Sequence, residues 1–379
     1  MTSFSASKLG RRAALAGLLA AAVAGRAAAA DNAAQAVWSL YKARFVAADG
    51  RVIDNDNHGV SHSEGQGYGL TLAEHFNDPV TFQRILDWTC RNMGRAGDAL
   101  HAWRYVPNVP VPVGDKNNAT DGDLFIAYAL SRAGRRWNRP DFKALASDIA
   151  TDILRLLVRR VVGRTLLMPG LDGFDTGESV TVNPSYYAMF AFEELNGVAP
   201  STWWAELTRD GLGLLRDARF GRWKLPPDWL CVDKSDGGMA PAANKPARFS
   251  WDAVRVPLYL AWSGYGGCEA ARSIAEFWAA SASGRMPAWI DLVTGQTAPY
   301  AASPGLVAVR DFALGAAHKA VPETQGRAAL PVNYYAASLM LLADVGRARV
   351  SELPNRPVLG EPPVPMPMAS SMPGGRART

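Results

Sequence analysis

Helical periodicity that recurs along most of the chain, with almost no strand pattern between, constrains the fold more than any other feature. Apolar residues return at helical spacing in segments 121–135, 185–195, 203–215, 270–280 and 334–342. Loops rich in Gly, Pro and Asp separate these segments, for example 168–178 and 226–248. Only 163–168 suggests a short hairpin arm. We therefore predict one all-α domain over residues 31–351.

The two ends of the chain differ from this helical body. Residues 1–30 combine Arg11-Arg12, an apolar run over 13–25 and alanines before Asp31, a pattern typical of an export signal peptide. The run is too short to span a bilayer, so we expect no stable membrane insertion and a periplasmic or secreted protein. Residues 352–379 are rich in Pro and poor in large apolar groups, which predicts a disordered tail.

The net charge of +5 comes almost entirely from the two ends of the chain. Residues 1–30 carry four basic residues and no acid, and residues 352–379 carry three Arg and two Glu. The body between them is therefore close to neutral. Such a body has no basic footprint for nucleic acid, and we expect no nucleic-acid partner.

A glycine-rich segment, 54–73, surrounds one glutamate, Glu64. Glycine at this density is tolerated where the backbone turns tightly or a ligand approaches it, and we expect a helix from Tyr68 onward. A carboxyl at such a loop-to-helix junction, partly removed from water, holds its proton near neutral pH, as a general acid must. The ordinary alternative is an acid that caps a helix or lies in its first turn.

Two further acids lie in suggestive settings. Asp121 belongs to the segment NNATDGDLFIAYAL, in which Thr120 or Asp121 is also able simply to cap the helix that follows. Asp252, in FSWDAVRVP, precedes Arg255 by three residues, so both side chains share one helix face. That pair is either an ordinary salt bridge or a carboxylate kept ionised by its neighbour, ready to accept a proton from water.

Taken together, these motifs resemble glycoside hydrolase family 8. The resemblance is carried by SEGQGYG around Glu64, NATDGDLFIAYAL around Asp121 and WDAVRVP around Asp252, followed by NPSYY at 183–187 and NYY at 333–335 in the order of that family's motifs. It covers most of residues 32–345.

The resemblance implies an (α/α)6 barrel, a six-hairpin toroid, with a substrate cleft across one end. It also implies endo-acting hydrolysis of a β-1,4-glucan such as cellulose, with inversion. Glu64 would donate the proton and Asp252 would activate water, whereas Asp121 would bind and distort the sugar, although descriptions of the family also give the base role to this Asp. Inverting enzymes separate acid and base by roughly 6.5–9.5 Å.

Sugar subsites need aromatic faces and polar groups near the acids. Our candidates for substrate binding come from the motifs and their neighbours, and they are Tyr68, Trp103, Arg104, Asn183, Tyr187, Trp251, Arg255 and Tyr335. Any one of the aromatic residues is equally able to be core.

We expect no cofactor and no metal, because His58 and His62 are four residues apart without an HExxH pattern. The alternative substrates are xylan, chitosan and mixed-linkage β-glucan, and the alternative class is a glucan-binding export guide that does not cut. The branch of the family found beside bacterial cellulose synthases implies the cellulose export machinery as a candidate partner.

Overall fold

The computed structural model describes residues 34–280, 285–315 and 330–351, so the predicted signal peptide and tail lie outside the described residues. Residues 34–45 are helical. The other α-helices are α2 (Ser63–His75), α3 (Pro79–Met93), α4 (Thr120–Arg136), α5 (Pro140–Leu157), α6 (Met189–Asn196), α7 (Thr202–Asp217), α8 (Val256–Trp262), α9 (Glu269–Ala279), α10 (Pro304–Gly315) and α11 (Tyr334–Ser351). Two 3-10 helices are η1 (Pro184–Tyr186) and η2 (Ala253–Arg255).

Short antiparallel strands occur in the segments that connect the helices. They are β1 (Ser61–His62) with β2 (Arg104–Tyr105), β3 (Val158–Val161) with β4 (Arg164–Leu167), β5 (Ser179–Val182) with β6 (Leu230–Asp233) and β7 (Met239–Pro241), and β8 (Arg248–Phe249) with β9 (Ile290–Asp291). The β3–β4 pair is the hairpin arm that the sequence suggested at 163–168.

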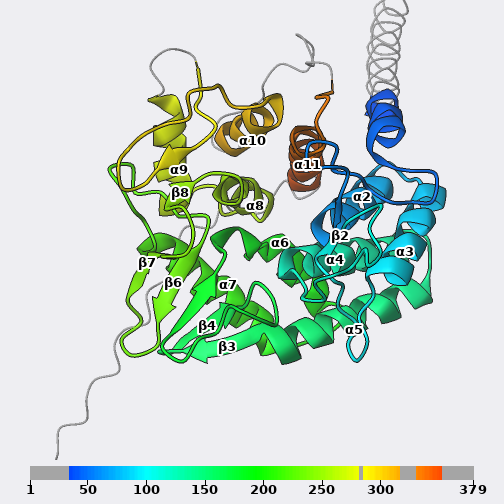
Figure 1. Cartoon of the computed structure of the whole chain (residues 1–379), viewed down its shortest axis with the longest axis horizontal. Coiled ribbons are helices and arrows are strands. Elements are labelled where there is room, and N and C mark those ends of the chain that lie inside the picture. Colours follow the sequence, from blue (N-terminus) through cyan, green and yellow to red (C-terminus); the bar gives the residue numbers. More distant parts are fainter. Residues whose placement is uncertain (1–33, 281–284, 316–329, 352–379) are drawn as a thin grey trace, which may run out of the picture.

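The helices form a ring with a second layer outside it (Figure 1). Around the ring, α2 packs on α4, α4 on α6, α6 on α8, α8 on α10, α10 on α11, and α11 returns to α2. Outside it, α3 packs on α2, α5 on α4, α7 on α6 and α9 on α8. A ring of six helices with further helices packed outside it is the (α/α)6 barrel that the family resemblance implied.

Aromatic side chains from the ring helices fill the space between α4, α6 and α8. The rings of Phe190 and Trp262 are stacked with centroids 4.1 Å apart, and Tyr128 meets both of them edge-on. Phe125 and Tyr259 join the same cluster. Each such pair adds about 0.5–1.5 kcal/mol beyond the apolar area it buries, so the centre of the ring is a rigid support for the ends of its helices.

The predicted helices agree with the structure at most positions, with one informative break. The expected helix at 121–135 is α4. The segment at 185–195 is divided into η1 and α6, because Tyr187 (φ −80°, ψ 70°) and Ala188 (φ −83°, ψ 78°) leave the helical region. No helix among the described residues is both long enough and apolar enough to cross a bilayer.

Candidate active site

Glu64, Asp121 and Asp252 lie together at one end of the helix ring. Glu64 is in the first turn of α2, Asp121 is in the first turn of α4, and Asp252 precedes η2, which leads into α8. The N-terminal turn of a helix presents unpaired N–H groups and a partial positive charge, which favour a nearby carboxylate. The ring therefore gathers three acids that are distant in the sequence.

Glycines let α2 and α4 approach closely beside these acids. A Cβ at position 122 would lie 2.2 Å from Ser63 Oγ and 2.7 Å from the Glu64 nitrogen, and a Cβ at position 67 would lie 2.6 Å from Phe125 Cβ. The helix begins at Ser63, not at Tyr68. From Ser63 onward the segment is therefore helical, and Gly67 serves close helix packing there, whereas Gly59 (φ +68°) lies in a turn as the sequence suggested.

The capping role that the sequence allowed for Thr120 or Asp121 is absent. Ala119 is the N-cap of α4 and makes no side-chain cap bond. The hydroxyl of Thr120 donates to the Met168 carbonyl at 2.6 Å, and Asp121 accepts only from the adjacent Gly122 nitrogen at 2.8 Å. A capping function therefore does not explain why an acid stands at position 121.

One buried guanidinium, that of Arg255, contacts all three acids. Its Nη1 donates to Glu64 Oε1 at 2.7 Å, and its Nη2 donates to Asp252 Oδ1 at 2.6 Å. Asp121 Oδ2 lies 3.5 Å from the same Nη2. The Arg255 side chain is 3% exposed, whereas those of Glu64 and Asp252 are 23% and 25% exposed. Two carboxyls therefore reach solvent while the charge that joins them does not.

The shared guanidinium sets a ceiling on the separation of Glu64 and Asp252. Because the two oxygens accept hydrogen bonds from the two terminal nitrogens of one planar group, they are at most about 7.5 Å apart. The two carboxyl groups are separated by roughly 6.5–9.5 Å in inverting glycosidases and by about 5–5.5 Å in retaining ones. The ceiling admits the shorter part of the inverting range, with room for one water. It also admits the retaining separation, so the product has to be examined directly.

Three carboxyls around one positive charge do not all ionise at low cost. Burial, followed by the negative charge of Glu64, raises the pKa of Asp121 well above its usual value. Burial also raises the pKa of Asp252 to about 6, against the opposing charge of Arg255. Asp121 is therefore the acid that holds a proton most firmly in the free protein.

Glu64 behaves differently from the sequence expectation of a protonated acid. Burial would raise its pKa, but the charge of Arg255, the Tyr68 hydroxyl and His62 together lower the pKa below its usual value. The Tyr68 hydroxyl also lies 2.9 Å from that of Tyr259. Glu64 is therefore ionised in the free protein, and Tyr68 contacts the Glu64 carboxyl from a fully buried position.

Of the two tyrosines in NPSYY, the structure turns Tyr186 toward the acids. The Tyr186 ring lies 5.9 Å from Arg255 Cζ, and burial together with the charges of Asp121 and Asp252 raises its pKa. Tyr187, the residue expected to bind substrate, is buried in the core, where its hydroxyl accepts from the Leu167 nitrogen at 3.1 Å. The structure therefore places Tyr186, and not the predicted Tyr187, beside the acids, because the helix breaks after η1.

Asn183 supports Arg255 through Ser185. Its Oδ1 accepts from the Ser185 nitrogen at 3.0 Å and from the Ser185 hydroxyl at 2.7 Å. The same hydroxyl accepts from Arg255 Nη2 at 2.9 Å. The side-chain nitrogen of Asn183, Nδ2, faces Asp252 and helps to lower the pKa of that carboxyl, without forming a direct hydrogen bond to it. Asn183 therefore acts on the site from a buried position.

The remaining predicted residues lie around the acids. Trp251 is 53% exposed, and the Tyr335 hydroxyl donates to its carbonyl at 2.5 Å. Trp103 lies beside Glu64, because its carbonyl accepts from the Ser63 nitrogen at 3.0 Å. Arg104 follows on β2, with its guanidinium 5.6 Å from the Trp103 ring.

The sequence did not predict a role for two groups of residues near the acids. Phe174 and Trp229 are stacked at 5.7 Å with 3° between their planes, and Trp229 meets Tyr186 edge-on at 6.3 Å. Asp228, next to Trp229, is buried and accepts hydrogen bonds from the segment that carries Asp252. The only signal in the sequence was the LPPDW stretch at 225–229, which does not by itself indicate contact with the acids.

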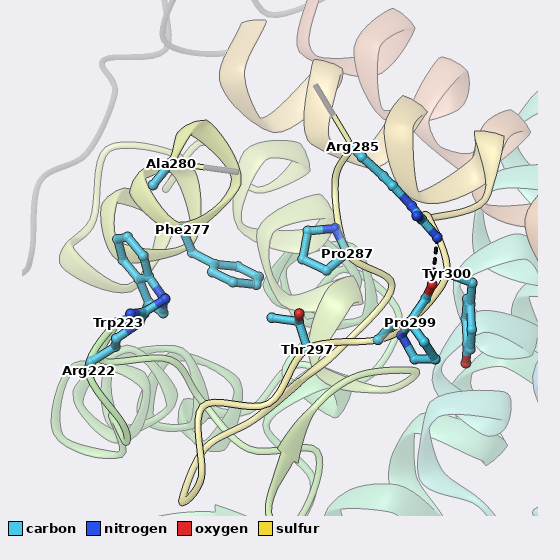
Figure 2. Close-up of a pocket in the computed structure, with 10 residues that line it drawn as sticks. Arg222, Trp223, Phe277, Ala280, Arg285, Pro287, Thr297, Pro299 and Tyr300 are labelled. Carbon is cyan, nitrogen blue, oxygen red and sulfur yellow. Dashed lines mark hydrogen bonds between the residues drawn. The ribbon is translucent and has the colours of Figure 1, made fainter. Parts of the chain in front are cut away.

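A separate cavity of about 280 Å³ lies beside the end of α9 (Figure 2). Trp223 and Phe277 line one side, and the loop that carries Arg285 and Tyr300 lines the other. Arg285 donates to the Pro299 carbonyl at 2.6 Å there. None of the three acids lines this cavity, so it is not the site that they form.

Comparisons with known proteins agree on one family. Residues 8–348 match the model for "Glycosyl hydrolases family 8". The chain is 40% identical over 322 residues to a probable endoglucanase of Novacetimonas hansenii, covering 84% of this chain and 93% of that protein. It is 38% identical over 286 residues to an endoglucanase of Cellulomonas uda, covering 74% and 78%. The structure of the endo-beta-1,4-glucanase CMCax from Acetobacter xylinum superposes with a TM-score of 0.79 at 39% identity, covering 85% of this chain and 99% of that one.

Proposed function

The chain belongs to glycosyl hydrolases family 8 and is a glycoside hydrolase of the endoglucanase type, and from this premise we propose that it cuts internal β-1,4 bonds of a cellulose-type glucan with inversion. The observation that carries the proposal is the convergence of Glu64, Asp121 and Asp252 on Arg255 at one end of the ring. Two partly exposed carboxyls held by one buried cation are the parts that glycoside hydrolysis needs.

In the proposed reaction, Asp252 accepts a proton from water as the water oxygen attacks the anomeric carbon. Glu64 donates a proton to the leaving glycosidic oxygen, so the bond breaks without a free alkoxide. Asp121 binds the sugar at the cleavage point. The raised pKa of Asp252, about 6, suits a base that is ionised at neutral pH yet accepts protons readily.

The acid role of Glu64 requires that substrate binding change its protonation. A sugar that covers the exposed part of the Glu64 carboxyl removes water from it, and this desolvation raises its pKa. Asp121 is the neighbouring carboxyl that already holds a proton. Two neighbouring ionised carboxylates repel each other, so one of the two acids keeps a proton. Transfer of that proton from Asp121 to Glu64 leaves the net charge of the site unchanged.

The relatives' names support β-1,4-glucan as the substrate. A reducing-sugar assay of the purified protein on carboxymethylcellulose, xylan, chitosan and lichenan, side by side, tests this choice. We expect the highest kcat/KM on carboxymethylcellulose. A higher value on xylan, chitosan or lichenan would move the substrate to that polymer while leaving the family and the acids in place.

Glu64→Gln distinguishes an enzyme from a glucan-binding export guide. The amide keeps the shape of the side chain but has no acidic proton, and general acid catalysis contributes about 10²–10⁴-fold. Turnover should fall by that factor while oligosaccharide binding, measured by calorimetry, persists. A variant that kept more than about a tenth of wild-type turnover would remove Glu64 from the acid role, because far less than the factor of a general acid would be lost.

We also propose that the protein is exported and acts beside the cellulose export machinery. The support is the Arg11-Arg12 pair with its short apolar run, together with the family branch that the motifs resemble. N-terminal sequencing of protein from the periplasm should begin near Asp31. Co-purification with the synthase complex tests the association, and its absence under mild extraction would argue against a stable complex.

A further inference from the structure

Asp228 is a buried carboxyl that holds the segment carrying Asp252. Its Oδ1 accepts from the Ser250 nitrogen at 2.9 Å and from the Ala253 nitrogen at 2.8 Å. Its Oδ2 accepts from the Ser250 hydroxyl. These donors lie on both sides of the Trp251–Asp252 dipeptide, so one carboxylate fixes the backbone before and after the proposed base.

The same residue is anchored at its own backbone. The Asp228 nitrogen donates to the Arg248 carbonyl at 2.7 Å, and Arg248 lies on β8, which pairs with β9. The side chain is only slightly exposed and is surrounded by donors. A buried carboxylate that accepts three hydrogen bonds is a rigid support, because each bond restrains the position of its donor group.

We propose that Asp228 is a positioning residue for the reaction. It fixes the backbone on either side of Asp252 and places a second negative charge near the Asp252 carboxyl. This inference rests on the proposed role of Asp252 as the base. It adds to that role a residue that touches neither the substrate nor the reacting water.

The electrostatic part of the inference follows from the groups that face Asp252. Those groups are Arg255, Asp228, Glu64, Asp121, Tyr186 and Tyr335. Burial is the largest contribution that raises the pKa of Asp252, the Arg255 charge opposes it, and the Asp228 charge supports it. A base with a higher pKa accepts a proton from water more readily, so Asp228 strengthens the base that it also positions.

Asp228→Asn separates charge from position. The amide oxygen is able to accept from the same two backbone nitrogens, and the amide nitrogen is able to donate to the Ser250 hydroxyl, so the geometry persists and the charge is lost. Removing a nearby negative charge lowers the pKa of Asp252. We therefore expect the acidic limb of the kcat/KM profile to move to lower pH.

Asp228→Ala and Ser250→Ala test position. The alanine at 228 removes all three bonds, so we expect kcat to fall about 10- to 100-fold with little change in KM, as a misplaced catalytic group does. Ser250→Ala removes one bond and leaves the charge, so its loss of kcat should be smaller and its acidic limb should stay in place.

The matched control is Asp291→Asn. Asp291 Oδ1 accepts from the Val293 nitrogen, the Thr294 nitrogen and the Thr294 hydroxyl, at 3.0, 2.8 and 3.0 Å, so it holds a loop by the same pattern without facing Asp252. We expect an unmoved acidic limb in this variant. A limb that stayed in place in Asp228→Asn as well, or a kcat of Asp228→Ala equal to that of wild type, would overturn the proposal.

A second readout does not depend on turnover. Carboxyl ¹³C NMR titration, with the Asp252 signal assigned by its loss in Asp252→Asn, should show a lower pKa for Asp252 in Asp228→Asn than in wild type. If the wild-type protein cut no glucan, the proposed function would fail, and the titration would still decide the effect of Asp228. An Asp252 titration unaltered by Asp228→Asn would refute the inference alone.

Discussion

Replacing Arg255 with Met is the sharpest test of how the site is held together. Arg255 is the one cation within 4.0 Å of any of the three acids in the described part of the chain, at 2.7 Å from Glu64, 2.6 Å from Asp252 and 3.5 Å from Asp121. Methionine keeps an unbranched apolar stem and removes the charge. The three carboxyls then face one another without a cation, so all three pKa values should rise.

The expected loss of stability follows from the geometry. Breaking a buried ion pair by removing one partner costs about 3–5 kcal/mol, because a charge stays buried without compensation. At roughly 2 °C per kcal/mol for a domain of this size, the melting temperature should fall by about 6–10 °C at pH 7. In wild type the folded pKa of Glu64 is lowered, so its ion pair stabilises the fold above the unfolded pKa and loses that effect as the pH falls through the folded pKa. The gap between variant and wild type should therefore be widest near pH 7 and narrow below about pH 4.

Thermal unfolding from pH 3 to pH 8, with turnover measured beside it, provides the assay. Turnover should fall by at least about 10²-fold, since both the proposed acid and the proposed base lose their partner. Arg349→Met is the control, because Arg349 pairs with the buried Glu74, which also contacts Arg132 and Arg136. That variant should keep its turnover. A melting temperature of Arg255→Met that is lowered equally at pH 3 and pH 7 would refute the electrostatic reasoning and indicate lost packing instead.

Four further predictions test the site. The kcat/KM of wild type should decline as the pH drops below about 6, because Asp252 must be ionised to accept a proton; a profile flat down to pH 4 would contradict its role as base. NMR of fresh products should show the α-anomer first from a β-linked substrate, and an initial β-anomer would mean a covalent intermediate. Tyr187→Phe should lower the melting temperature and spare kcat, whereas Tyr186→Phe should lower kcat; the reverse pattern would return Tyr187 to the site. Trp251→Ala should raise KM several-fold with little change in stability, because its ring is 53% exposed, and an unchanged KM would remove it from the subsites.

The sequence predicted the fold class and the three acids because helical periodicity and short motifs are both local patterns of residues. Helical periodicity identified α4 to within one residue at each end. The motifs around Glu64, Asp121 and Asp252 named three residues that the structure brings to one guanidinium. Local patterns did not decide between the adjacent residues Tyr186 and Tyr187, since a short break in helix sets which ring lies near the acids.

The sequence by itself determined which residues are present and which of them are close along the chain, such as Asp252 and Arg255 three residues apart. Only the tertiary structure decided how those residues are charged. Closure of the ring places Glu64 and Asp121 beside the same buried guanidinium, and burial, followed by repulsion from Glu64, keeps the proton on Asp121 in the free protein. The loop before β6 brings Asp228 to the Ser250 and Ala253 nitrogens on either side of Asp252. The physical reason is that a pKa depends on burial and on charges within a few ångströms, and those distances are set by the packing of helices that are remote in the chain.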